Sequence, residues 1–385
     1  MFGKFKRFFA VAGVSTLLAA CQIIPGGNTG PANTPAPEPT PSQSTLPQDE
    51  ARHRVALLVP LTGTNAGVGQ SIANATTMAL LDTNADNLRI TTYDTAKGAK
   101  TAADRAVADG NKLILGPLLG DNVPSVLAAA APANVPLISF SNDVSVASSD
   151  VFVMGHIPEQ SVARTVDYAM SQGSRRFAAL TPKGEYGDRA AKALAKAVEA
   201  RGGQMVASQS YDRGNSFIIS AAKKLSAQGG FDTVLIADGA RLSAIAAAQL
   251  KKAGDDLPHI LGTELWSGEA SIANAAALRG AWFSSVPDAR YRRFVESYEA
   301  RFGSKPYRIA TLGYDSVLLT LRIARDWKPG RNFPVSRLKA SDGFIGLDGI
   351  FRFGPDGVGE RGMETRQIGN GTVSVVAPAP DKFKN

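Results

Sequence analysis

The residues that could carry catalysis or bind a metal are few and isolated in this sequence. His53, His156 and His259 are its only histidines, and none has a second histidine four residues away, as the H-E-x-x-H motif of zinc hydrolases requires. Ser220 and Lys223 have the S-x-x-K spacing of serine acyl-transfer enzymes, but they lie in an expected amphipathic helix and lack the K-T-G and S-D-N companions. We therefore expect no enzyme and no metal site.

One glycine pattern could in principle bind a nucleotide cofactor. The stretch GVGERG at residues 357–362 fits G-x-G-x-x-G, but the strand-like METRQI follows it. A pyrophosphate site needs a helix N-terminus at that point. We interpret residues 357–362 as a hairpin turn and predict no cofactor.

The N-terminal segment has the layout of a secretory signal. A basic start at Lys4, Lys6 and Arg7 is followed by an apolar run of roughly a dozen residues, too short to span a bilayer. Small residues then precede Cys21, the only cysteine of the 385 residues, and LLAAC at 17–21 resembles the bacterial lipobox. We expect a signal peptide over residues 1–20 and a lipidated Cys21, with an ordinary signal peptide and a chance cysteine as the alternative.

The segment after the cysteine reads as a tether. Residues 21–52 are rich in Pro, Ser, Thr, Gln and Gly, so they have too little apolar surface to fold and are predicted to be disordered. Gln22 stands where an acidic residue would favour retention at the inner membrane, which resembles lipoproteins of the outer membrane in many diderm bacteria. We expect a lipid anchor at the periplasmic face of the outer membrane and leave an inner-membrane anchor open.

The charge balance is mildly basic, with 42 Lys and Arg against 34 Asp and Glu and a formal net charge of +8. The basic residues form no dense stripe with interleaved aromatic residues, which a nucleic-acid interface would need. We expect a solvated mixed surface and no nucleic-acid partner.

From residue 53 onward short apolar strands alternate with amphipathic helices. RVALLVPL, LRITTYD, KLILGPL and VPLISFS are such strands, and repeated βα units predict parallel sheets with helices on both faces. About 330 structured residues exceed one ordinary domain. We expect an α/β fold of two doubly wound parallel-sheet lobes joined by a multi-strand hinge. The expected segments are 53–155 plus 287–335 for the N-terminal lobe, 156–286 plus 336–370 for the C-terminal lobe, and 371–385 for a tail.

Longer motifs carry a family resemblance. VALLVPLTGTNAGVGQSIANATTMALLD, LILGPLLGDNV, KGEYGDRAAKAL and LDGIFRFGPDG resemble the leucine/isoleucine/valine-binding branch of type I periplasmic ligand-binding proteins, over nearly all of residues 54–370. PLISFSND, LGTELW and GFIGLDGIFRFGPDGVGERG resemble, within that branch, the lipoprotein group of penicillin-binding protein activators. The resemblance implies a type I periplasmic-binding-protein fold, no catalysis and, for the activators, regulation of peptidoglycan-synthesising enzymes.

Ligands of open α/β sheets bind beyond the carboxyl ends of the strands, so two facing lobes would share one cleft there. The resemblance implies that amino-acid binders hold the ligand carboxylate with hydroxyls and backbone amides of the first lobe. They would contact the ligand through a tyrosine at Tyr186 and bind its amine with an acid at Glu264. The candidate cleft residues are Thr62, Gly63, Leu118, Gly120, Asp121, Ser141, Asn142, Asp143, Tyr186, Asp238 and Glu264.

Two aspartates depart from the amino-acid-binding pattern. Asp121 and Asp143 stand where small or hydroxylic residues are expected, and an unpaired aspartate would repel a ligand carboxylate. A cationic or sugar-like ligand, or an empty cleft, fits as well. The plainer alternative for Asp143 is a turn cap, and for Tyr186 a ring that covers the core.

Two functions follow. The preferred one is an interaction protein, a lipoprotein that reaches a peptidoglycan synthase of the penicillin-binding class and activates it. The alternative is a solute receptor that delivers an amino acid or a related small molecule to an ABC transporter.

Overall fold

The computed structural model describes residues 51–251 and 257–383. The expected signal peptide, Cys21 and the tether up to residue 50 lie outside these residues. Among the helices that are described, none is long and apolar enough to cross a membrane. The described residues all belong to one compact unit, residues 43–385.

The first lobe is built on a parallel sheet with the strand order β2-β1-β3-β4-β5. Its strands are β1 (His53–Val59), β2 (Leu88–Asp94), β3 (Leu113–Leu115), β4 (Leu137–Ser139) and β5 (Val151–Val153). Val55 and Leu57 of β1 pack in the cluster that includes α1 and α9, whereas Ala56 and Leu58 pack in the cluster that includes α2 and α3. The sheet is therefore covered on both faces.

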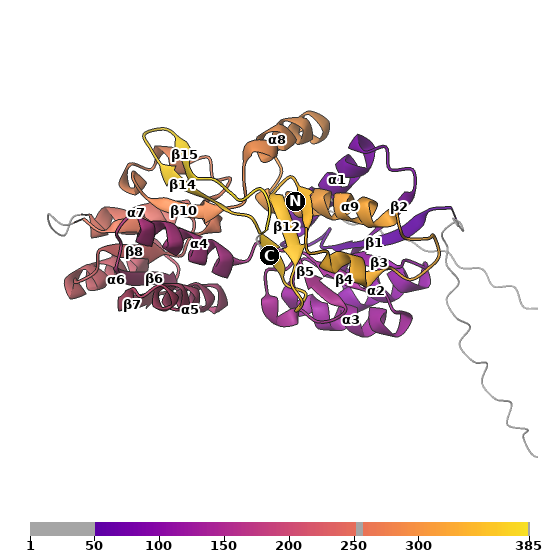
Figure 1. The fold of residues 1–385 in the computed structure, drawn as a ribbon, viewed down its shortest axis with the longest axis horizontal. Helices are drawn as coiled ribbons and strands as arrows, with labels where there is room; N and C mark the ends of the chain where they lie inside the picture. The colour runs from indigo at the N-terminus through magenta and orange to yellow at the C-terminus, as the bar shows by residue number, and fades with distance from the viewer. Residues whose placement is uncertain (1–50, 252–256, 384–385) are drawn as a thin grey trace, which may run out of the picture. The chain divides into compact units, whose positions relative to one another are not determined.

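Figure 1 shows these layers, with α1 and α9 on one side of the first sheet and α2 and α3 on the other. The helices are α1 (Ala66–Asp82), α2 (Ala99–Ala108), α3 (Val123–Ala130), α8 (Ala289–Phe302) and α9 (Thr311–Ala324). Short 3-10 segments lie in the connections, among them Gly120–Asn122, Val144–Val146 and Arg308–Ala310.

The second lobe is built on a sheet with the order β15-β14-β10-β9-β8-β6-β7. Strands β6 to β10 are parallel, and β14 and β15 add an antiparallel edge. The strands are β6 (Arg176–Pro182), β7 (Gln204–Tyr211), β8 (Thr233–Ile236), β9 (His259–Leu261), β10 (Trp282–Ser285), β14 (Glu364–Ile368) and β15 (Val373–Ala377). The helices α4 (Pro158–Ser171) and α5 (Glu185–Ala200) pack on one face, and α6 (Asn215–Gln228) and α7 (Ala240–Leu250) pack on the other.

The expected fold class is confirmed: the chain forms an α/β structure of two lobes with doubly wound parallel sheets. Its connections cross between the lobes after β5, after β10 and before β14. A hairpin is present close to the expected position, but its turn lies at residues 354–358 and not at 357–362. Residues 359–361 form β13 (Gly359–Arg361), the antiparallel neighbour of β12 (Gly349–Phe353). Together with β11 (Phe344–Gly346) they form a small third sheet.

The expected boundary at residue 336 needs correction. Leu338, Phe344, Phe351 and Phe353 belong to the core cluster of the first lobe, so residues 338–353 do not join the second lobe. Their large apolar side chains complete the cluster that contains Phe152 of β5, whose ring makes an edge contact with Phe353 at 5.2 Å between centroids. The expected tail is also partly structured, since residues 373–377 form β15.

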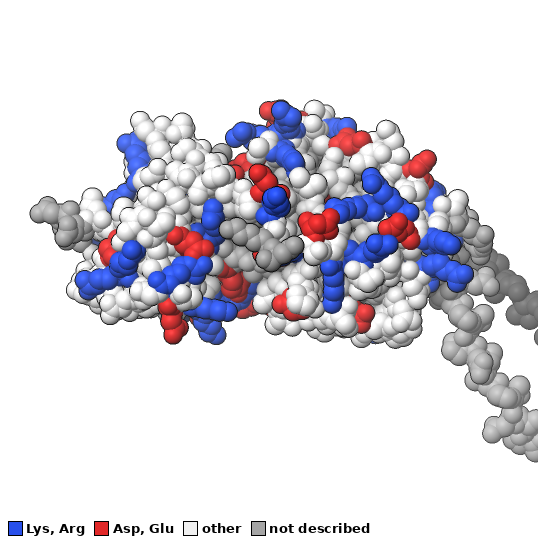
Figure 2. Space-filling model, in the orientation of Figure 1, with Lys and Arg blue, Asp and Glu red and all other residues white. Residues whose placement is uncertain are grey.

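The visible face of the molecule carries both signs of charge. Figure 2 shows Lys and Arg interspersed with Asp and Glu over both sheets' helices on that face.

Ser220 and Lys223, the pair with acyl-transferase spacing, lie exposed on helix α6.

Candidate functional site

A cavity of about 420 Å³ lies between the carboxyl ends of the two sheets. Four of the residues expected in the cleft line it, namely Leu118, Ser141, Asn142 and Glu264. The remaining lining residues are Asn65, Val68, Leu119, Phe140, His156, Leu265, Ser267, Arg308 and Ile309. The cavity thus has an apolar wall from the first lobe and a few polar groups from both lobes.

Tyr186 and Glu264, which the sequence placed on opposing loops of the second lobe, are hydrogen-bonded to each other. The Tyr186 hydroxyl donates to Oε1 of Glu264 at 2.9 Å and lies 2.8 Å from Oγ1 of Thr263. Burial, and then the charge of Glu264, raises the pKa of Tyr186 above its ordinary value. The hydroxyl therefore stays protonated and positions the carboxyl group.

The carboxyl group of Glu264 has a raised pKa, so it stays protonated to a higher pH than an ordinary glutamate. Burial raises the pKa of its carboxyl to about 7, and the hydrogen bond from Tyr186 acts against this shift without cancelling it. Its Oε2 atom is buried and has no hydrogen-bond partner. Because buried polar atoms are normally paired, this unpaired oxygen is consistent with a carboxyl group that keeps its proton.

Arg308, which sequence reasoning missed, lines the cavity from the 3-10 segment Arg308–Ala310. Its Nη1 donates to Oδ1 of Asp348 at 2.7 Å, and its guanidinium lies 4.1 Å from the centre of the Tyr291 ring. Its Nε and Nη2 atoms are buried without a hydrogen-bond partner. Arg308 therefore brings to the site a positive charge that is held by the Asp348 carboxylate.

Asp348 anchors this side of the cavity. Its carboxylate also lies 2.7 Å from Nε2 of His156 and accepts a 2.8 Å hydrogen bond from the Thr311 hydroxyl. Burial opposes ionisation of this group, but Arg308 and His156 hold the pKa of Asp348 well below its ordinary value. Burial lowers the pKa of His156 in turn, against the pull of Asp348.

The first loop of the first lobe is held by a carboxylate that does not line the cavity. Asp94, at the end of β2, accepts hydrogen bonds from the Leu61 amide and the Thr62 hydroxyl, both at 2.8 Å. Burial alone would raise the pKa of Asp94, but these hydrogen bonds together lower it below its ordinary value. Thr62 and the neighbouring Gly63, which has a positive φ of 73°, therefore shape the first loop.

Asp143 takes the plainer of its two expected roles. Its Oδ1 accepts from the Ser145 amide at 2.9 Å and the Ser145 hydroxyl at 2.7 Å, which caps the 3-10 segment Val144–Val146. Asp121 is exposed in the segment Gly120–Asn122, and Gly120 lies so close to the next loop that an added Cβ would be 3.1 Å from Oγ of Ser141. Neither aspartate lines the cavity.

Asp238 is turned into the second lobe. It accepts hydrogen bonds from the Tyr211 hydroxyl and the Gly239 amide, each at 2.8 Å. Its backbone carbonyl accepts from the indole of Trp266, the last residue of the LGTELW motif, which is fully buried. The motif is thus explained by core packing, and only its Glu264 and Leu265 reach the cavity.

Arg189 of α5 joins the two lobes beside the cavity. Its Nη2 donates to the backbone oxygen of Asn142 at 2.7 Å, and Glu159 of α4 accepts from its Nε and Nη2 at 2.7 and 2.9 Å. Burial acts in the opposite direction, but Glu159 raises the pKa of Arg189. The KGEYGDRAAKAL motif contains this residue, but no spacing rule pointed to a contact with the other lobe.

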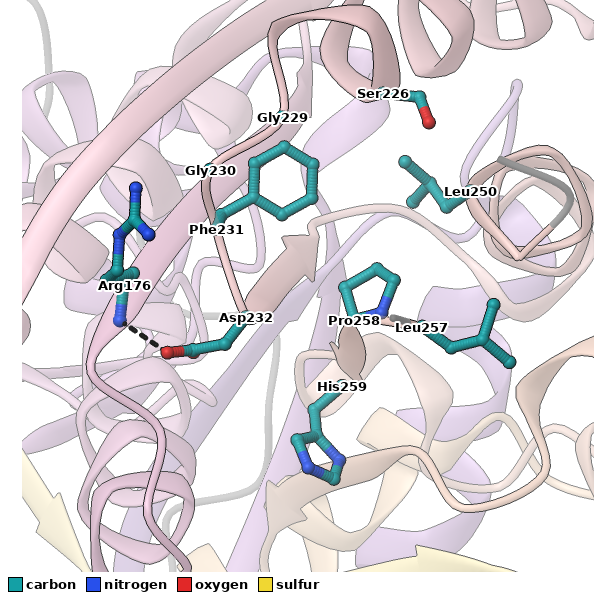
Figure 3. Close-up of a pocket in the computed structure, with 10 residues that line it drawn as sticks. All are labelled: Arg176, Ser226, Gly229, Gly230, Phe231, Asp232, Leu250, Leu257, Pro258 and His259. Atoms are coloured by element: carbon teal, nitrogen blue, oxygen red, sulfur yellow. Dashed lines mark hydrogen bonds between the residues drawn. The ribbon is translucent and has the colours of Figure 1, made fainter. Parts of the chain in front are cut away.

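A second cavity, of about 570 Å³, lies at the amino ends of strands β6, β8 and β9. Figure 3 shows Arg176, Asp232 and His259 around it, with the hydrogen bond of 3.0 Å from the Arg176 amide to Asp232. Because ligands of such sheets collect at the carboxyl ends of the strands, we place the candidate site in the 420 Å³ cavity instead. In the described residues no cluster of three or more metal-ligating side chains occurs.

The chain has curated relatives that it matches only over part of their length. It is 32% identical over 142 residues to the uncharacterized protein RP748 of Rickettsia prowazekii, a stretch that is 36% of this chain and 38% of that protein. It is 29% identical over 126 residues to the penicillin-binding protein activator LpoA of Serratia proteamaculans, which is 32% of this chain and 18% of LpoA. The LpoA of Photobacterium profundum is 27% identical over 159 residues, 39% of this chain and 25% of that protein.

Solved structures match over nearly the whole folded part. A putative branched-chain amino acid ABC transporter protein from Rhodospirillum rubrum superposes with a TM-score of 0.75 at 21% identity, covering 84% of this chain and all of that one. LivJ from Streptococcus pneumoniae in complex with isoleucine gives 0.64 at 20% identity, over 86% and 100%. A solute-binding protein from Rhodopseudomonas palustris in complex with 3,4-dihydroxybenzoic acid gives 0.66 at 20%, over 87% and 98%.

These structural likenesses show the fold. The family model of the periplasmic binding proteins matches residues 53–372, which include every strand of both sheets except β15 and every residue that lines the candidate site. The chain therefore belongs to the periplasmic binding protein family.

Proposed function

We propose that this chain is a non-catalytic envelope lipoprotein that activates a peptidoglycan-synthesising penicillin-binding protein. The observation that carries the proposal is the sequence similarity to two penicillin-binding protein activators, 29% over 126 residues and 27% over 159 residues. The matched stretches cover 18% and 25% of those proteins, so the activity is proposed for the shared domain.

The N-terminal pattern supports the same proposal. A lipidated Cys21 followed by a tether up to residue 52 would hold the folded body at the periplasmic face of the outer membrane. A synthase that works on the cell wall would then lie within reach of the tethered body.

The contacts between the lobes support a role that does not require a ligand. Arg189 bonds to the Asn142 backbone across the lobes, and Tyr186 and Glu264 bond to each other. The Tyr186 hydroxyl, one oxygen of Glu264 and the Asn142 carbonyl therefore have partners within the chain. A folded domain held by such internal contacts can present the same surface to a synthase without a bound ligand.

The test is a reconstituted synthesis assay. The mature chain is added to the cognate synthase, and glycan polymerisation and peptide crosslinking are measured against a heat-denatured sample of the same chain. We expect a rise in at least one of the two rates. No change in either rate at saturating concentration would reject the proposal.

A second candidate, a solute receptor of an ABC transporter, is favoured by one specific observation. Of the nine buried side-chain atoms without a partner in the described residues, four belong to Glu264, Ser267 and Arg308, which line the cavity. Unpaired polar atoms are thus concentrated in residues of the cavity wall. Thermal unfolding in the presence of amino acids and related solutes tests this, since a ligand at a thousand times its Kd stabilises by about 4 kcal/mol.

A further inference from the structure

We propose that the first lobe carries a basic face that docks the folded body onto anionic phospholipid headgroups, beside the lipid anchor of the same chain. The inference goes beyond the proposed function, because it concerns a membrane contact and not the surface that activates a synthase. It rests on the proposed anchor at Cys21 only for the position of the body above the membrane. The basic face consists of six exposed side chains on the last turn of α9 and in the segment between α9 and β11, namely Arg322, Arg325, Lys328, Arg331, Arg337 and Lys339.

This segment has a clear excess of positive charge on an otherwise mixed surface. Residues 322–342 contain the six cations and only two acids, Asp326 and Asp342, so their net charge is +4 in a chain whose formal net charge is +8. Figure 2 shows Lys and Arg gathered over α9 and the loop that follows it. Half of the net charge of the chain is thus concentrated in one short segment.

The acids of the segment neutralise only two of the six cations. Arg322 pairs with Asp342 at 3.0 Å, and Arg337 pairs with Asp326 at 3.2 Å. All four of these side chains are at least 45% exposed, so both pairs contribute little and can open to other partners. The cations of the face that have no carboxylate within ion-pair distance, in the part of the chain that the structure describes, are Arg325, Lys328 and Arg331.

The loop that carries these cations is fixed to the body at the point where β1 begins. Its buried Trp327 stacks on His53, the first residue of β1, with 4.2 Å between the ring centroids. Trp327 also makes an edge contact with Phe333 at 5.2 Å and donates to the backbone oxygen of Arg331 at 2.9 Å. The cations are therefore held on a packed loop beside the entry of the chain into the first lobe.

The place of the basic face favours a membrane as its partner. Residues 22–50 connect the proposed lipid anchor at Cys21 to the start of the folded body, so the region around His53 is nearest to the anchor along the chain. An anchored body meets headgroups at a high local concentration, so a weak attraction is enough to hold it against the membrane. Each Lys or Arg close to an anionic surface adds to this attraction.

The chemistry of the face fits a headgroup layer better than a protein surface. Residues 322–342 expose no large apolar side chain, since Trp327, Phe333 and Leu338 are buried. Protein interfaces have an apolar centre with aromatic side chains, whereas attraction to headgroups needs only charge within a Debye length of the surface. Arg binds phosphate oxygens through parallel N–H bonds, and Lys binds them as a point charge.

The first experiment measures vesicle binding without a synthase and without acyl chains. The full mature chain with Cys21→Ser is sedimented with vesicles of phosphatidylethanolamine and phosphatidylglycerol and, separately, with vesicles of phosphatidylcholine. We expect binding to the anionic vesicles to be about tenfold stronger or more, and to be lost in 1 M salt, where the Debye length is about 3 Å. No binding to the anionic vesicles, or equal binding to both kinds, would overturn the inference. Because no synthase is present, this outcome is independent of the activation assay.

A triple variant locates the contact on the basic face. Arg325→Gln, Lys328→Gln and Arg331→Gln together remove the three unpaired cations, so binding to the anionic vesicles should fall about tenfold or more. These side chains are exposed and form no ion pair among the described residues, so the variant should unfold at the urea concentration of the wild type. Unchanged vesicle binding in this variant would overturn the inference.

A second triple variant controls for net charge. Lys196→Gln, Lys223→Gln and Lys224→Gln remove three exposed cations from α5 and α6 of the second lobe. This variant should keep the wild-type affinity for the anionic vesicles. An equal loss in the two triple variants would show a response to net charge alone and would overturn the basic face.

A single fluorescent label reports which face touches the membrane. Cys21 is the only cysteine of the sequence, so in the Cys21→Ser chain a label can be placed through Ser336→Cys, in the basic loop, or through Ser220→Cys, exposed on α6. An acceptor on the headgroups of the anionic vesicles should quench the label at position 336 more strongly. Equal quenching would place another face on the membrane and overturn the inference. Binding to peptidoglycan sacculi that only the first triple variant loses, with its vesicle binding unchanged, would assign the face to the wall polymer and overturn the inference as well.

Discussion

The guanidinium of Arg189 and the backbone oxygen of Asn142 lie 2.7 Å apart and join a helix of the second lobe to a loop of the first. Glu159 accepts two hydrogen bonds from the same guanidinium and so fixes its direction. Asn142 belongs to the loop after β4 that also lines the candidate cavity. The side chain of Arg189 therefore connects the two lobes at this point.

Replacing Arg189 should loosen this contact. In Arg189→Met the Asn142 carbonyl loses its donor and Glu159 loses its partner, so we expect amide hydrogen exchange to become faster in residues 140–145 and at the start of α5. Because the ion pair is partly exposed, the free energy of unfolding should fall by only about 1 kcal/mol. Exchange mass spectrometry and urea unfolding measure the two effects.

Lys192→Met provides the matched control, because Lys192 is exposed on the same helix. It removes the same charge without touching the other lobe, so exchange in residues 140–145 should stay at the wild-type rate. Equal exchange in the two variants would show that the contact does not hold the lobes.

Glu264 should make stability depend on pH. Burial raises its pKa to about 7 from an ordinary value of 4.5, so between these pH values the folded chain binds more protons at this site than the unfolded chain. The free energy of unfolding therefore falls as the pH rises through this window and levels off above it. Asp315, whose pKa burial and Asp348 also raise to about 7, contributes a change of the same sign.

The variant Glu264→Gln isolates the contribution of Glu264. Its loss of stability between pH 4.5 and pH 7.5 should be smaller than that of the wild type, by on the order of 2 kcal/mol. Urea unfolding at the two pH values measures the difference. Glu299→Gln, at an exposed position on α8, should keep the wild-type slope; a wild-type slope in Glu264→Gln would mean that Glu264 is ionised throughout.

Tyr186→Phe tests the tyrosine of the Tyr186–Glu264 hydrogen bond. The change removes the hydroxyl that donates to Glu264 and bonds to Thr263. A hydrogen bond to an ionised carboxylate is stronger than one to a neutral acid, so the loss of stability should be larger at pH 8 than at pH 5, at about 2 against about 1 kcal/mol. Tyr307→Phe, with a ring that is 54% exposed, is the control and should change little at either pH. If the loss of stability in Tyr186→Phe did not depend on pH, the Tyr186 hydroxyl would not be coupled to the titration of Glu264.

The sequence predicted those parts of the fold that follow from local periodicity. Val55, Leu57, Ala56 and Leu58 alternate between two apolar faces, as the run RVALLVPL indicates for a strand buried on both sides. Repeated strands of this type with helices between them define the parallel sheets. A hairpin in this region was likewise predictable, but its turn lies at residues 354–358 and not at 357–362, because residues 359–361 pair with β12.

The composition of the site depended on contacts that have no spacing rule. Arg308 and Asp348 lie 40 residues apart, and only the folded chain shows that one neutralises the other. From the sequence alone, Phe351 and Phe353 could belong to either lobe, because apolar residues pack equally well against either sheet. The return of residues 338–353 to the first lobe is decided by the shape of the cluster around Phe152, which no local pattern encodes.

Asp348 should be the least replaceable carboxylate around the candidate cavity. It is fully buried, bonds to Arg308 at 2.7 Å and His156 at 2.7 Å, and lies 3.9 Å from Nη1 of Arg361. Asp348→Asn keeps the shape of the side chain but leaves two buried guanidinium groups without their counter-charge. Removing one partner of a buried ion pair costs about 3–5 kcal/mol, so we expect a loss of that size in urea unfolding.

Asp342→Asn is the control that makes this result specific. Asp342 pairs with Arg322 at 3.0 Å, and the side chains are 73% and 45% exposed. An exposed pair contributes little, so this variant should lose no more than about 0.5 kcal/mol. If Asp348→Asn lost as little as Asp342→Asn, the buried charges would have found other partners, and the rigid placement of Arg308 beside the cavity would no longer follow.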